Sequence, residues 1–445
     1  MWSLILLLPF SSGFLLTPKH PWLTSKPVLT QTQAQEVLQS TSDYCVVAGV
    51  TGYSGFVPVL ADNSSMYYWL TNKLGTDVST DTSPLILWLD GGPGGSSFNG
   101  NLYMVGPLYI NASLEAVSRP VTWASDYHLL FLDNPLGAGF SFVTNETDYS
   151  TTETEVAANV YTTLVGLNSS HPQWFQNRDM YIFGPSYAGK YIPSVAAYIL
   201  QKNAVVGQFK FPLVGVGIGD GLTDPVTQFA DYSNYGFAAG LIDEEERVVV
   251  QGIERKTIQA IETENWATVY SAIEDVYQFI GLRSGNVSLY NVRSFNFTVP
   301  PYGISWANSS ASKSLLHVPS TLPFVFSSMP AFNALIPDIG KSVKGLFPYL
   351  LQHLKVLLYN GQDDLIISPS GAENWIDSIP WPGQAGFAAT GKTVWTVQGQ
   401  IAGYVRSFEG LTQVVVLKAG HGVEYFQPEN ALAMVNTFIE GGNWT

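Results

Sequence analysis

Six short apolar runs along the chain end in glycine, aspartate, asparagine, proline or serine. Runs of this length without polar alternation are typical of strands that are buried on both faces, as in a parallel sheet covered by helices. We therefore predict six buried strands, each followed by a loop. They are LILWLDGG (85–92), LLFLDNP (129–135), MYIFGPS (180–186), LVGVGIGDG (213–221), KVLLYNG (355–361) and QVVVLKAGHG (413–422).

Helical patterns alternate with some of these strands. They cover residues 153–168 and 188–203, and Pro193 is expected to kink the second helix. Alternating strands and helices predict an α/β fold with a mostly parallel central sheet flanked by helices. Upstream, the alternating segments YSGFVPVL (53–60) and SMYYWLTN (65–72) predict an antiparallel hairpin at one edge of that sheet.

The strand pattern stops in the middle of the chain and resumes at Lys355. The interruption carries amphipathic helical patterns around 242–280, followed by a segment rich in serine, asparagine and proline. We interpret it as an inserted, mainly helical cap. The expected organisation is a first core segment over 17–222, the cap over 223–354 and a second core segment over 355–445.

The amino terminus, MWSLILLLPFSSGFLL, holds an apolar run that is too short to span a bilayer. With the small residues that follow the run, it indicates a secretory signal peptide over 1–16, the alternative being a buried N-terminal segment. Eight N-x-[ST] sequons support passage through the secretory pathway, to the extracellular space or to a lysosome-like acidic vesicle. They begin at Asn63, Asn111, Asn145, Asn168, Asn286, Asn296, Asn308 and Asn443.

Composition excludes several classes of protein. Hydrophobic residues make up 46% of the chain and charged residues 12%, which is incompatible with a disordered chain. The formal charge is -15 without a basic cluster, so we expect no nucleic-acid partner. No later stretch has the pattern of a membrane-spanning helix. Cys45 is the only cysteine, which excludes an internal disulfide, and we expect it to be a small buried residue in or near a strand rather than a nucleophile.

The segment YIFGPSYAGKY (181–191) holds the strongest chemical signal. A strand followed by G-x-S-x-[AG] and then a helix has the pattern of a nucleophile elbow, a sharp turn that raises a serine hydroxyl above the sheet. Gly184 and Ala188 are the small residues beside Ser186, and the following helix points its N-terminal amides toward developing negative charge. A strand-to-helix turn without chemistry is the alternative.

A serine hydroxyl needs a base within hydrogen-bond reach, usually a histidine that a carboxylate orients. In α/β-hydrolases the order along the chain is serine, acid, histidine. After Ser186 the chain offers YNGQDDLI at one strand end and KAGHGVEY at another. Of the six histidines, His421 alone directly follows a buried strand in a glycine-containing loop. Position and order therefore favour His421 as the base.

Six blocks of the sequence resemble, in order, the motifs of the serine carboxypeptidases, and most closely their vitellogenic-like branch. The resemblance runs from about Tyr53 to Trp444 and implies an α/β-hydrolase fold with a helical cap inserted near the middle. The blocks are LILWLDGGPGGSS, LLFLDNPLGAGFSF, GPSYAGKYIP, GVGIGDGLTDP, VLLYNGQDDLI and KAGHGVEYFQP.

The resemblance implies a role for individual residues. Ser186 matches the family's nucleophile, His421 its base and Asp364, rather than the adjacent Asp363, its triad acid. The oxyanion hole would consist of the backbone N–H groups of Gly92 and Tyr187. The glycine-rich segments GGPGG and GVGIGDG are interpreted as a tight turn and a closely packed strand, not as a phosphate loop or a dinucleotide fingerprint.

The family's sites for a substrate's C-terminal carboxylate are altered in this chain. The resemblance implies an asparagine before the glycine pair, a glutamate before the nucleophile and a second glutamate ahead of a Gly-Pro. Asp90 (before Gly91), Pro185 and Met104 stand at these positions. Two close glutamates share a proton that they donate to a carboxylate, whereas methionine and proline cannot do so. We therefore expect weakened recognition of a free carboxylate.

The leading hypothesis is a serine-type carboxypeptidase that acts on peptides through an acyl-enzyme, with altered carboxylate recognition. The alternatives are an esterase, amidase or acyltransferase on the same triad, and a non-catalytic relative. No cofactor is expected, and no metal, because no His, Cys and carboxylate cluster has ligand spacing. A homodimer is possible by resemblance to the family.

Overall fold

The computed structural model describes residues 23–39, 43–295 and 299–444. The predicted signal peptide and the sequon at Asn296 lie outside these residues. The centre of the molecule is a sheet of eleven strands in the order β13-β14-β15-β12-β10-β9-β5-β8-β4-β3-β2. Its six middle strands are parallel to one another. They are β5 (Leu85–Trp88), β8 (His128–Leu132), β9 (Met180–Pro185), β10 (Leu213–Gly219), β12 (Lys355–Gly361) and β15 (Leu411–Val416).

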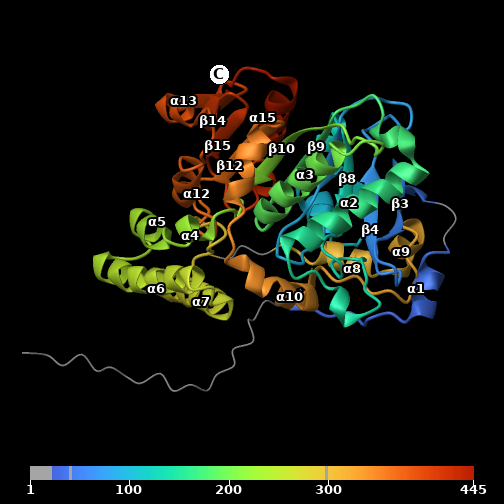
Figure 1. Ribbon diagram of the computed structural model, residues 1–445, viewed down its shortest axis with the longest axis horizontal. Coiled ribbons are helices and arrows are strands. Elements are labelled where there is room, and N and C mark those ends of the chain that lie inside the picture. The colour runs from blue at the N-terminus through green and yellow to red at the C-terminus, as the bar shows by residue number, and fades with distance from the viewer. Residues whose placement is uncertain (1–22, 40–42, 296–298, 445) are drawn as a thin grey trace, which may run out of the picture.

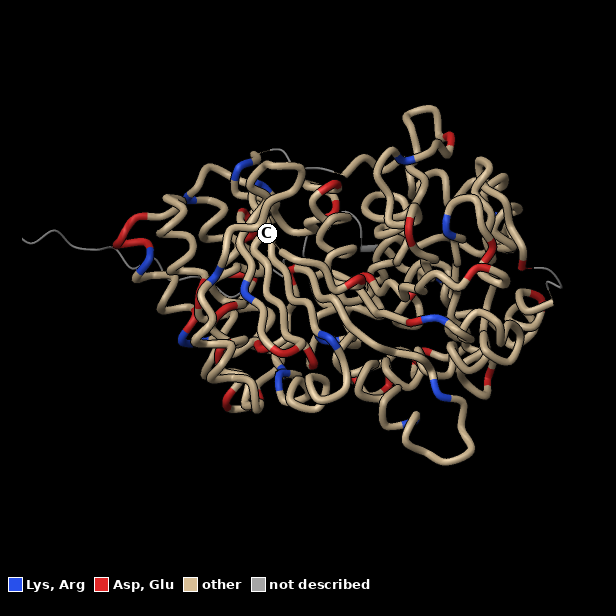
Figure 2. The backbone as a smooth tube through the Cα atoms, turned by 90° about the horizontal axis from the view of Figure 1, so that it is seen from above, with Lys and Arg blue, Asp and Glu red and all other residues tan. Residues whose placement is uncertain are grey.

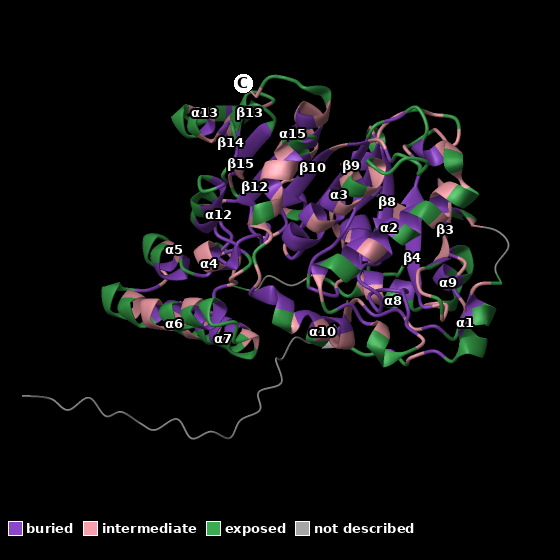
Figure 3. Cartoon of the chain, in the orientation of Figure 1, coloured by how far each residue is buried: buried purple, intermediate pink, exposed green. Residues whose placement is uncertain are grey.

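Each of the six predicted strands is therefore confirmed. In each of the six, at most one residue is not buried, which explains why the sequence shows unbroken apolar runs instead of alternation. Figure 3 shows the same strands as the buried centre of the molecule, with exposed residues on the outer faces of the helices. The result is the expected α/β arrangement.

Antiparallel strands extend both edges of the sheet. On one side β3 (Val50–Pro58) and β4 (Ser65–Thr71) form the predicted hairpin, and β2 (Tyr44–Val47), which contains the buried Cys45, lies outside it at the edge. On the other side β14 (Gln400–Phe408) pairs with β15, and β13 (Thr393–Val397) pairs with β14. The sequence analysis did not predict this second pair.

Helices flank the sheet (Figure 1). The helix α2 (Glu153–Ser170) is capped by the preceding Thr152, whose side chain accepts from the Glu155 N–H in a capping box. The helix α3 (Ala188–Asn203) continues through Pro193. Proline lacks the N–H that would reach the Gly189 carbonyl, and the Thr223 hydroxyl donates to that oxygen instead, at 3.2 Å. This bond supports the helix directly behind the Ser186 turn.

Between β10 and β12 the described chain is mainly helical, with the two-residue β11 (Ser327–Ser328) as its one strand. The helices α6 and α7 pack on each other and lie to one side of the sheet in Figure 1. The α6 helix starts with a capping box of Asp243 and Glu246. The helices of this stretch are α4 (Pro225–Gln228), α5 (Tyr232–Ala238), α6 (Glu244–Glu262), α7 (Trp266–Arg283), α8 (Tyr302–Ala307), α9 (Ser310–Leu315), α10 (Met329–Ile339) and α11 (Phe347–Leu351).

A buried ion pair fastens this stretch to the core. Lys190 Nζ in α3 lies 2.6 Å from Asp338 Oδ2 in α10, and both side chains are almost fully buried. The Tyr187 hydroxyl also contacts the Asp338 carboxylate, at 3.4 Å. Removing one partner of such a pair leaves an uncompensated buried charge, so α10 and the start of α3 are held together.

The remaining elements are short or peripheral. They are β1 (Leu23–Thr24), β6 (Leu108–Ile110), β7 (Ala116–Ser118), α1 (Gln31–Val37), α12 (Pro369–Ile376), α13 (Gln384–Ala389), α14 (Val423–Phe426) and α15 (Pro428–Glu440). No helix in the described ranges is both long enough and apolar enough to cross a membrane. Lysine and arginine are scattered among the acidic residues along the described backbone (Figure 2).

Candidate active site

Loops that follow five neighbouring parallel strands meet at one edge of the sheet. Because the carboxyl ends of parallel strands lie together, residues distant in sequence gather there. The five strands lie in the order β15-β12-β10-β9-β5. The loops after them carry, in the same order, His421, Asp364, Asp220, Ser186 and the Gly91–Gly92 pair.

Ser186 forms the sharp turn between β9 and α3. Its φ of 65° lies in the left-handed region, which is strained for a residue with a side chain. The surrounding backbone holds it there, because its N–H donates to the Gly219 carbonyl at 2.9 Å and its own carbonyl accepts from Leu222 N at 3.0 Å. Ser186 Oγ makes no hydrogen bond to a described residue, so the hydroxyl is available to a ligand.

Small residues permit this turn. A Cβ on Gly91 would lie 2.7 Å from Ser186 Cβ and 2.8 Å from Tyr187 N, which excludes any larger side chain at that position. A Cβ on Gly184 would lie 3.0 Å from Ala188 Cβ and would overlap the Leu89 carbonyl oxygen. Gly184 and Ala188 are therefore required where the sequence pattern predicted small residues.

The structure brings His421 and Asp364 together. His421 Nδ1 lies 2.7 Å from Asp364 Oδ2, a distance typical of a hydrogen bond to a carboxylate. The adjacent Asp363 instead pairs with Arg293, Nε to Oδ1, at 2.7 Å. Of the two neighbouring aspartates, only Asp364 orients the imidazole.

Burial governs the protonation of this pair. It lowers the pKa of His421 below its usual value, although the nearby carboxyls of Asp220, Glu424 and Asp90 act in the opposite direction. The imidazole is thus kept neutral and able to accept a proton. Burial raises the pKa of Asp364 well above its usual value, and the backbone N–H of Ile367 partly offsets this by donating to the carboxyl.

A cavity of about 650 Å³ opens beside Ser186. Gly92 and Tyr187 also line it, and neither of their backbone N–H groups donates a hydrogen bond to a described residue. Two free N–H groups next to a serine hydroxyl are the arrangement that binds an oxyanion. The Tyr290 ring lines the same cavity and lies 5.3 Å from the His421 ring, so Tyr290 lies between the cavity and the imidazole, which does not itself line it.

One contact of the predicted constellation is not formed. Ser186 Oγ and His421 Nε2 are not hydrogen-bonded to each other, whereas His421 and Asp364 are. In enzymes without substrate, catalytic hydrogen bonds are often long and tighten when the substrate binds. The structure therefore joins the acid to the imidazole, and it brings the serine next to the two free N–H groups.

The three residues that differ from the expected family pattern, Asp90, Met104 and Pro185, lie around this site. Asp90 is buried, and its carboxyl accepts hydrogen bonds from Trp88, Asn99 and two backbone N–H groups. Burial raises the pKa of Asp90, and these donors partly offset the rise. Met104 Cε lies 3.1 Å from the position of a Cβ on Gly422, so it fills the space beside the histidine loop. Pro185 is buried in β9 and offers no N–H.

Two buried carboxyls near His421 were missed in the sequence analysis. Glu424 accepts a 2.5 Å hydrogen bond from the Tyr359 hydroxyl, its Oε2 has no described partner, and burial raises its pKa to about 6. Asp220 lies within the segment that was interpreted only as a closely packed strand. Its position at the end of a buried strand is the same signal that drew attention to the YNGQDDLI segment.

Donor atoms of Asp220, Asp364 and His421 lie within 4.8 Å of one another, which is close enough for shared ligation of a cation. Their hydrogen bonds account for this proximity without an ion. His421 Nδ1 is engaged by Asp364, and both Asp220 oxygens accept backbone N–H groups. We therefore assign the group to hydrogen bonding.

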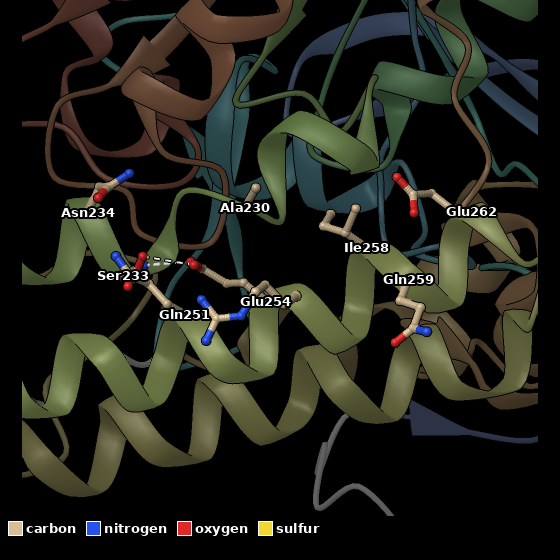
Figure 4. A pocket seen from close by; sticks show the side chains of 9 residues that line it. Ala230, Ser233, Asn234, Gln251, Glu254, Ile258, Gln259 and Glu262 are labelled. Atoms are coloured by element: carbon tan, nitrogen blue, oxygen red, sulfur yellow. Dashed lines mark hydrogen bonds between the residues drawn. The ribbon is translucent and has the colours of Figure 1, made fainter.

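A second cavity, of about 410 Å³, lies between α5 and α6 and contains no residue of the predicted site (Figure 4). Its most buried charged group, Glu254, is already bound by the N–H and hydroxyl of Ser233, at 2.7 and 2.8 Å. The buried carboxylate of this cavity is therefore already engaged within the protein.

Known proteins share this architecture. A family model described as serine carboxypeptidase matches residues 46–441. A probable serine carboxypeptidase CPVL of Dictyostelium discoideum is 36% identical over 87% of this chain and 78% of its own length. The venom serine carboxypeptidase of Apis mellifera is 33% identical over 88% of this chain and 85% of its own length.

Among solved structures, the prohormone-processing carboxypeptidase Kex1 of Saccharomyces cerevisiae superposes with a TM-score of 0.76 at 24% identity. The superposition covers 92% of this chain and 94% of the Kex1 chain, and it confirms the α/β-hydrolase fold. The expected resemblance, including that to the vitellogenic-like branch, is also confirmed. The chain belongs to the serine carboxypeptidase family.

Proposed function

We propose that this protein is a serine-type carboxypeptidase that releases C-terminal residues from peptides through an acyl-enzyme. The observation that carries the proposal is the 2.7 Å hydrogen bond between Asp364 and His421 at the sheet edge that also presents the strained Ser186. Serine, imidazole and carboxylate supplied by neighbouring strand ends are the parts of a nucleophilic triad. Membership of the serine carboxypeptidase family supports the same reaction.

In the proposed mechanism His421 accepts the Ser186 proton while Oγ attacks the scissile carbonyl. Asp364 holds the imidazole in the required tautomer and stabilises its charged form. The N–H groups of Gly92 and Tyr187 bind the oxyanion, and His421 then donates the proton to the leaving amine. Water next attacks the acyl-enzyme with His421 again as base, which releases the shortened peptide and restores Ser186.

The direct assay incubates the protein with a peptide that has a free C-terminus and follows its mass over time. Loss of one residue at a time from that end is the expected result. Hydrolysis of esters with no shortening of the peptide would instead support the esterase or acyltransferase alternative. Failure with both substrates, in a folded protein, would support a non-catalytic relative.

We infer that a free carboxylate contributes little to substrate choice, because Asp90 is acidic and Met104 and Pro185 offer no donor. Losing charge-assisted hydrogen bonds to a carboxylate costs about 2 to 3 kcal/mol, or roughly two decades of specificity. We therefore expect kcat/KM for a blocked dipeptide acid to exceed that for its amide by less than about tenfold, without confinement to acidic pH. A preference above about a hundredfold that exists only in acid contradicts this inference.

The cavity beside Ser186 indicates the substrate side chain. Apart from Glu274, its walls are uncharged and mostly aliphatic or aromatic, with Ile273, Phe332 and Ile339 among them. We expect peptides that place phenylalanine or leucine there to be cleaved at least about a hundredfold faster than peptides with aspartate, because burying an unpaired carboxylate is costly. Steady-state kinetics on a matched peptide series measures this ratio. Equal rates for leucine and aspartate contradict it, and Glu274→Gln should relax the discrimination.

We propose that residues 223–354 act as a cap between core segments 17–222 and 355–445, because α7 and α10 supply walls of the cavity. A signal peptide over 1–16, sequon glycosylation, and a secreted or lysosome-like location remain proposals from the sequence. A homodimer and the absence of a nucleic-acid partner likewise stay predictions.

A further inference from the structure

Asp220 lies at the carboxyl end of β10 and is completely buried. Its φ of 45° is left-handed, which is strained for an aspartate. Its Oδ1 accepts from the backbone N–H of Gly361 at 2.7 Å, and its Oδ2 accepts from the backbone N–H of Gly422 at 2.9 Å. One carboxyl therefore binds two loops that are separate in sequence.

These two loops carry the acid and the base of the proposed triad. Gly361 ends β12, three residues before Asp364, and Gly422 directly follows His421. The Asp220 segment also holds the serine turn, because Gly219 accepts the Ser186 N–H at 2.9 Å and Leu222 donates to the Ser186 carbonyl at 3.0 Å. A single short segment thus contacts all three loops of the triad through hydrogen bonds.

The Asp220 carboxyl also lies beside the acid itself. One side-chain atom each of Asp220, Asp364 and His421 lies within 4.8 Å of the other two, and both carboxyls are fully buried. Two adjacent buried carboxylates repel strongly, and the pair lowers its energy by keeping one proton between them. Burial and the Asp364 charge both raise the pKa of Asp220 well above its usual value, in agreement with this geometry.

We propose that Asp220 is a positioning residue of the triad, which fastens the Asp364 and His421 loops to the Ser186 turn and shares one proton with Asp364. This inference rests on the proposed function and names a residue that acts through the triad without touching the substrate. While the proton is shared, the pair carries one negative charge, which is the charge that stabilises an imidazolium. When the shared proton is lost, the two carboxylates repel each other. The loops that Asp220 holds then move apart.

The ionisable groups that face Asp220 come from three segments of the chain. Asp364 and Tyr359 belong to β12 and its loop, His421 to the loop after β15, and Tyr235 to α5. Burial raises the pKa of Tyr359 well above its usual value, so that group stays protonated at neutral pH. Burial also raises the pKa of Tyr235 beyond the physiological range. The groups left to titrate beside Asp220 are therefore Asp364 and His421, and Glu424, whose pKa is about 6, lies beyond them on the Tyr359 hydroxyl.

Two substitutions at Asp220 test the two parts of the proposal, the fastening of the loops and the shared proton. Asp220→Ala removes both hydrogen bonds to the loops, and a displacement of catalytic groups by about 1 Å lowers rates by about a hundredfold. We expect that loss in kcat, with KM changed by less than about threefold. Asp220→Asn keeps the size of the group and can still accept one of the two backbone N–H groups, but it holds no titratable proton. We expect it to move the alkaline limb of kcat/KM upward by at least about one pH unit.

Asp224→Asn is the matched control. Asp224 is also a buried aspartate of this loop, but its carboxyl binds Lys344 at 2.7 Å and Thr227 at 3.0 Å instead of the triad loops. Its pH profile should coincide with that of the wild type. Thermal unfolding of every variant reports whether it is folded. If Asp220→Ala does not fold, the alkaline limb of kcat/KM for Asp220→Asn tests the proposal.

The proposal is overturned if folded Asp220→Ala keeps kcat within about threefold of the wild type, or if Asp220→Asn leaves the alkaline limb in place. It is also overturned if the wild type shows no alkaline limb. Failure of the proposed function can be distinguished from failure of the Asp220 proposal, because the wild type itself would then hydrolyse no peptide or ester. In that case hydrogen exchange at Gly361 and Gly422 tests the loop contacts, and Asp220→Ala must accelerate it.

Discussion

Replacing Ser186 with alanine is expected to abolish peptide hydrolysis, with kcat/KM falling by at least about 10⁴-fold. The substitution removes the atom that forms the acyl-enzyme, and the remaining groups can only polarise the substrate or bind water. The two N–H groups beside the turn remain, so peptide binding and a small background rate should persist. Initial rates on one peptide, with KM determined separately, measure the effect.

Ser288→Ala is the matched control, because Ser288 lines the same cavity as Ser186. We expect that variant to keep kcat within a few-fold of the wild type. Thermal unfolding should show Ser186→Ala to be about as stable as the wild type, since alanine places the same Cβ in the left-handed conformation and the lost hydroxyl makes no hydrogen bond to a described residue. A folded Ser186→Ala protein that keeps a tenth or more of the activity would exclude Ser186 as the nucleophile.

Replacing Asp364 with asparagine is expected to lower kcat by about 10⁴-fold while leaving KM nearly unchanged. The amide can hold the ring, but as a donor it favours the wrong imidazole tautomer, and it no longer stabilises the positive charge that His421 acquires. The size of the drop reflects how completely this carboxyl is buried, because no water replaces it. Steady-state kinetics at several pH values measures it.

Asp363→Asn provides the comparison within the same sequence pair. Asp363 is paired with Arg293 and does not contact His421, so we expect its loss to change kcat by less than about tenfold. The two adjacent aspartates should therefore differ by about three decades. If Asp363→Asn is the more damaging substitution, the assignment of the acid to Asp364 is wrong.

The middle of the fold could be predicted from the sequence because its strands are buried on both faces. Apolar runs such as Leu85–Trp88 therefore appear without interruption. The edge strand Thr393–Val397 could not, because four of its five residues are at least partly exposed and no apolar run forms. The helix Met329–Ile339 contains two prolines, Pro330 and Pro337, which obscure its helical pattern.

The site, too, could be predicted in part from the sequence, where a residue occupies a recognisable position in a motif, and not where its role depends on packing. Ser186, Asp364 and His421 each occupy a recognisable position after a strand, and their order along the chain is informative. The importance of Asp220 and Glu424 depends on which loops pack against them. Asp220 binds N–H groups 141 and 202 residues away, and sequence spacing carries no record of such contacts.

Labelling with a fluorophosphonate probe, followed by mass spectrometry of the digested protein, tests the central claim most directly. The account predicts one stable adduct on Ser186, formed rapidly by the wild type and much more slowly by Asp364→Asn. A folded wild-type protein that acquires no adduct, or that carries it on another serine, would contradict the claim that this sheet edge holds an activated nucleophile.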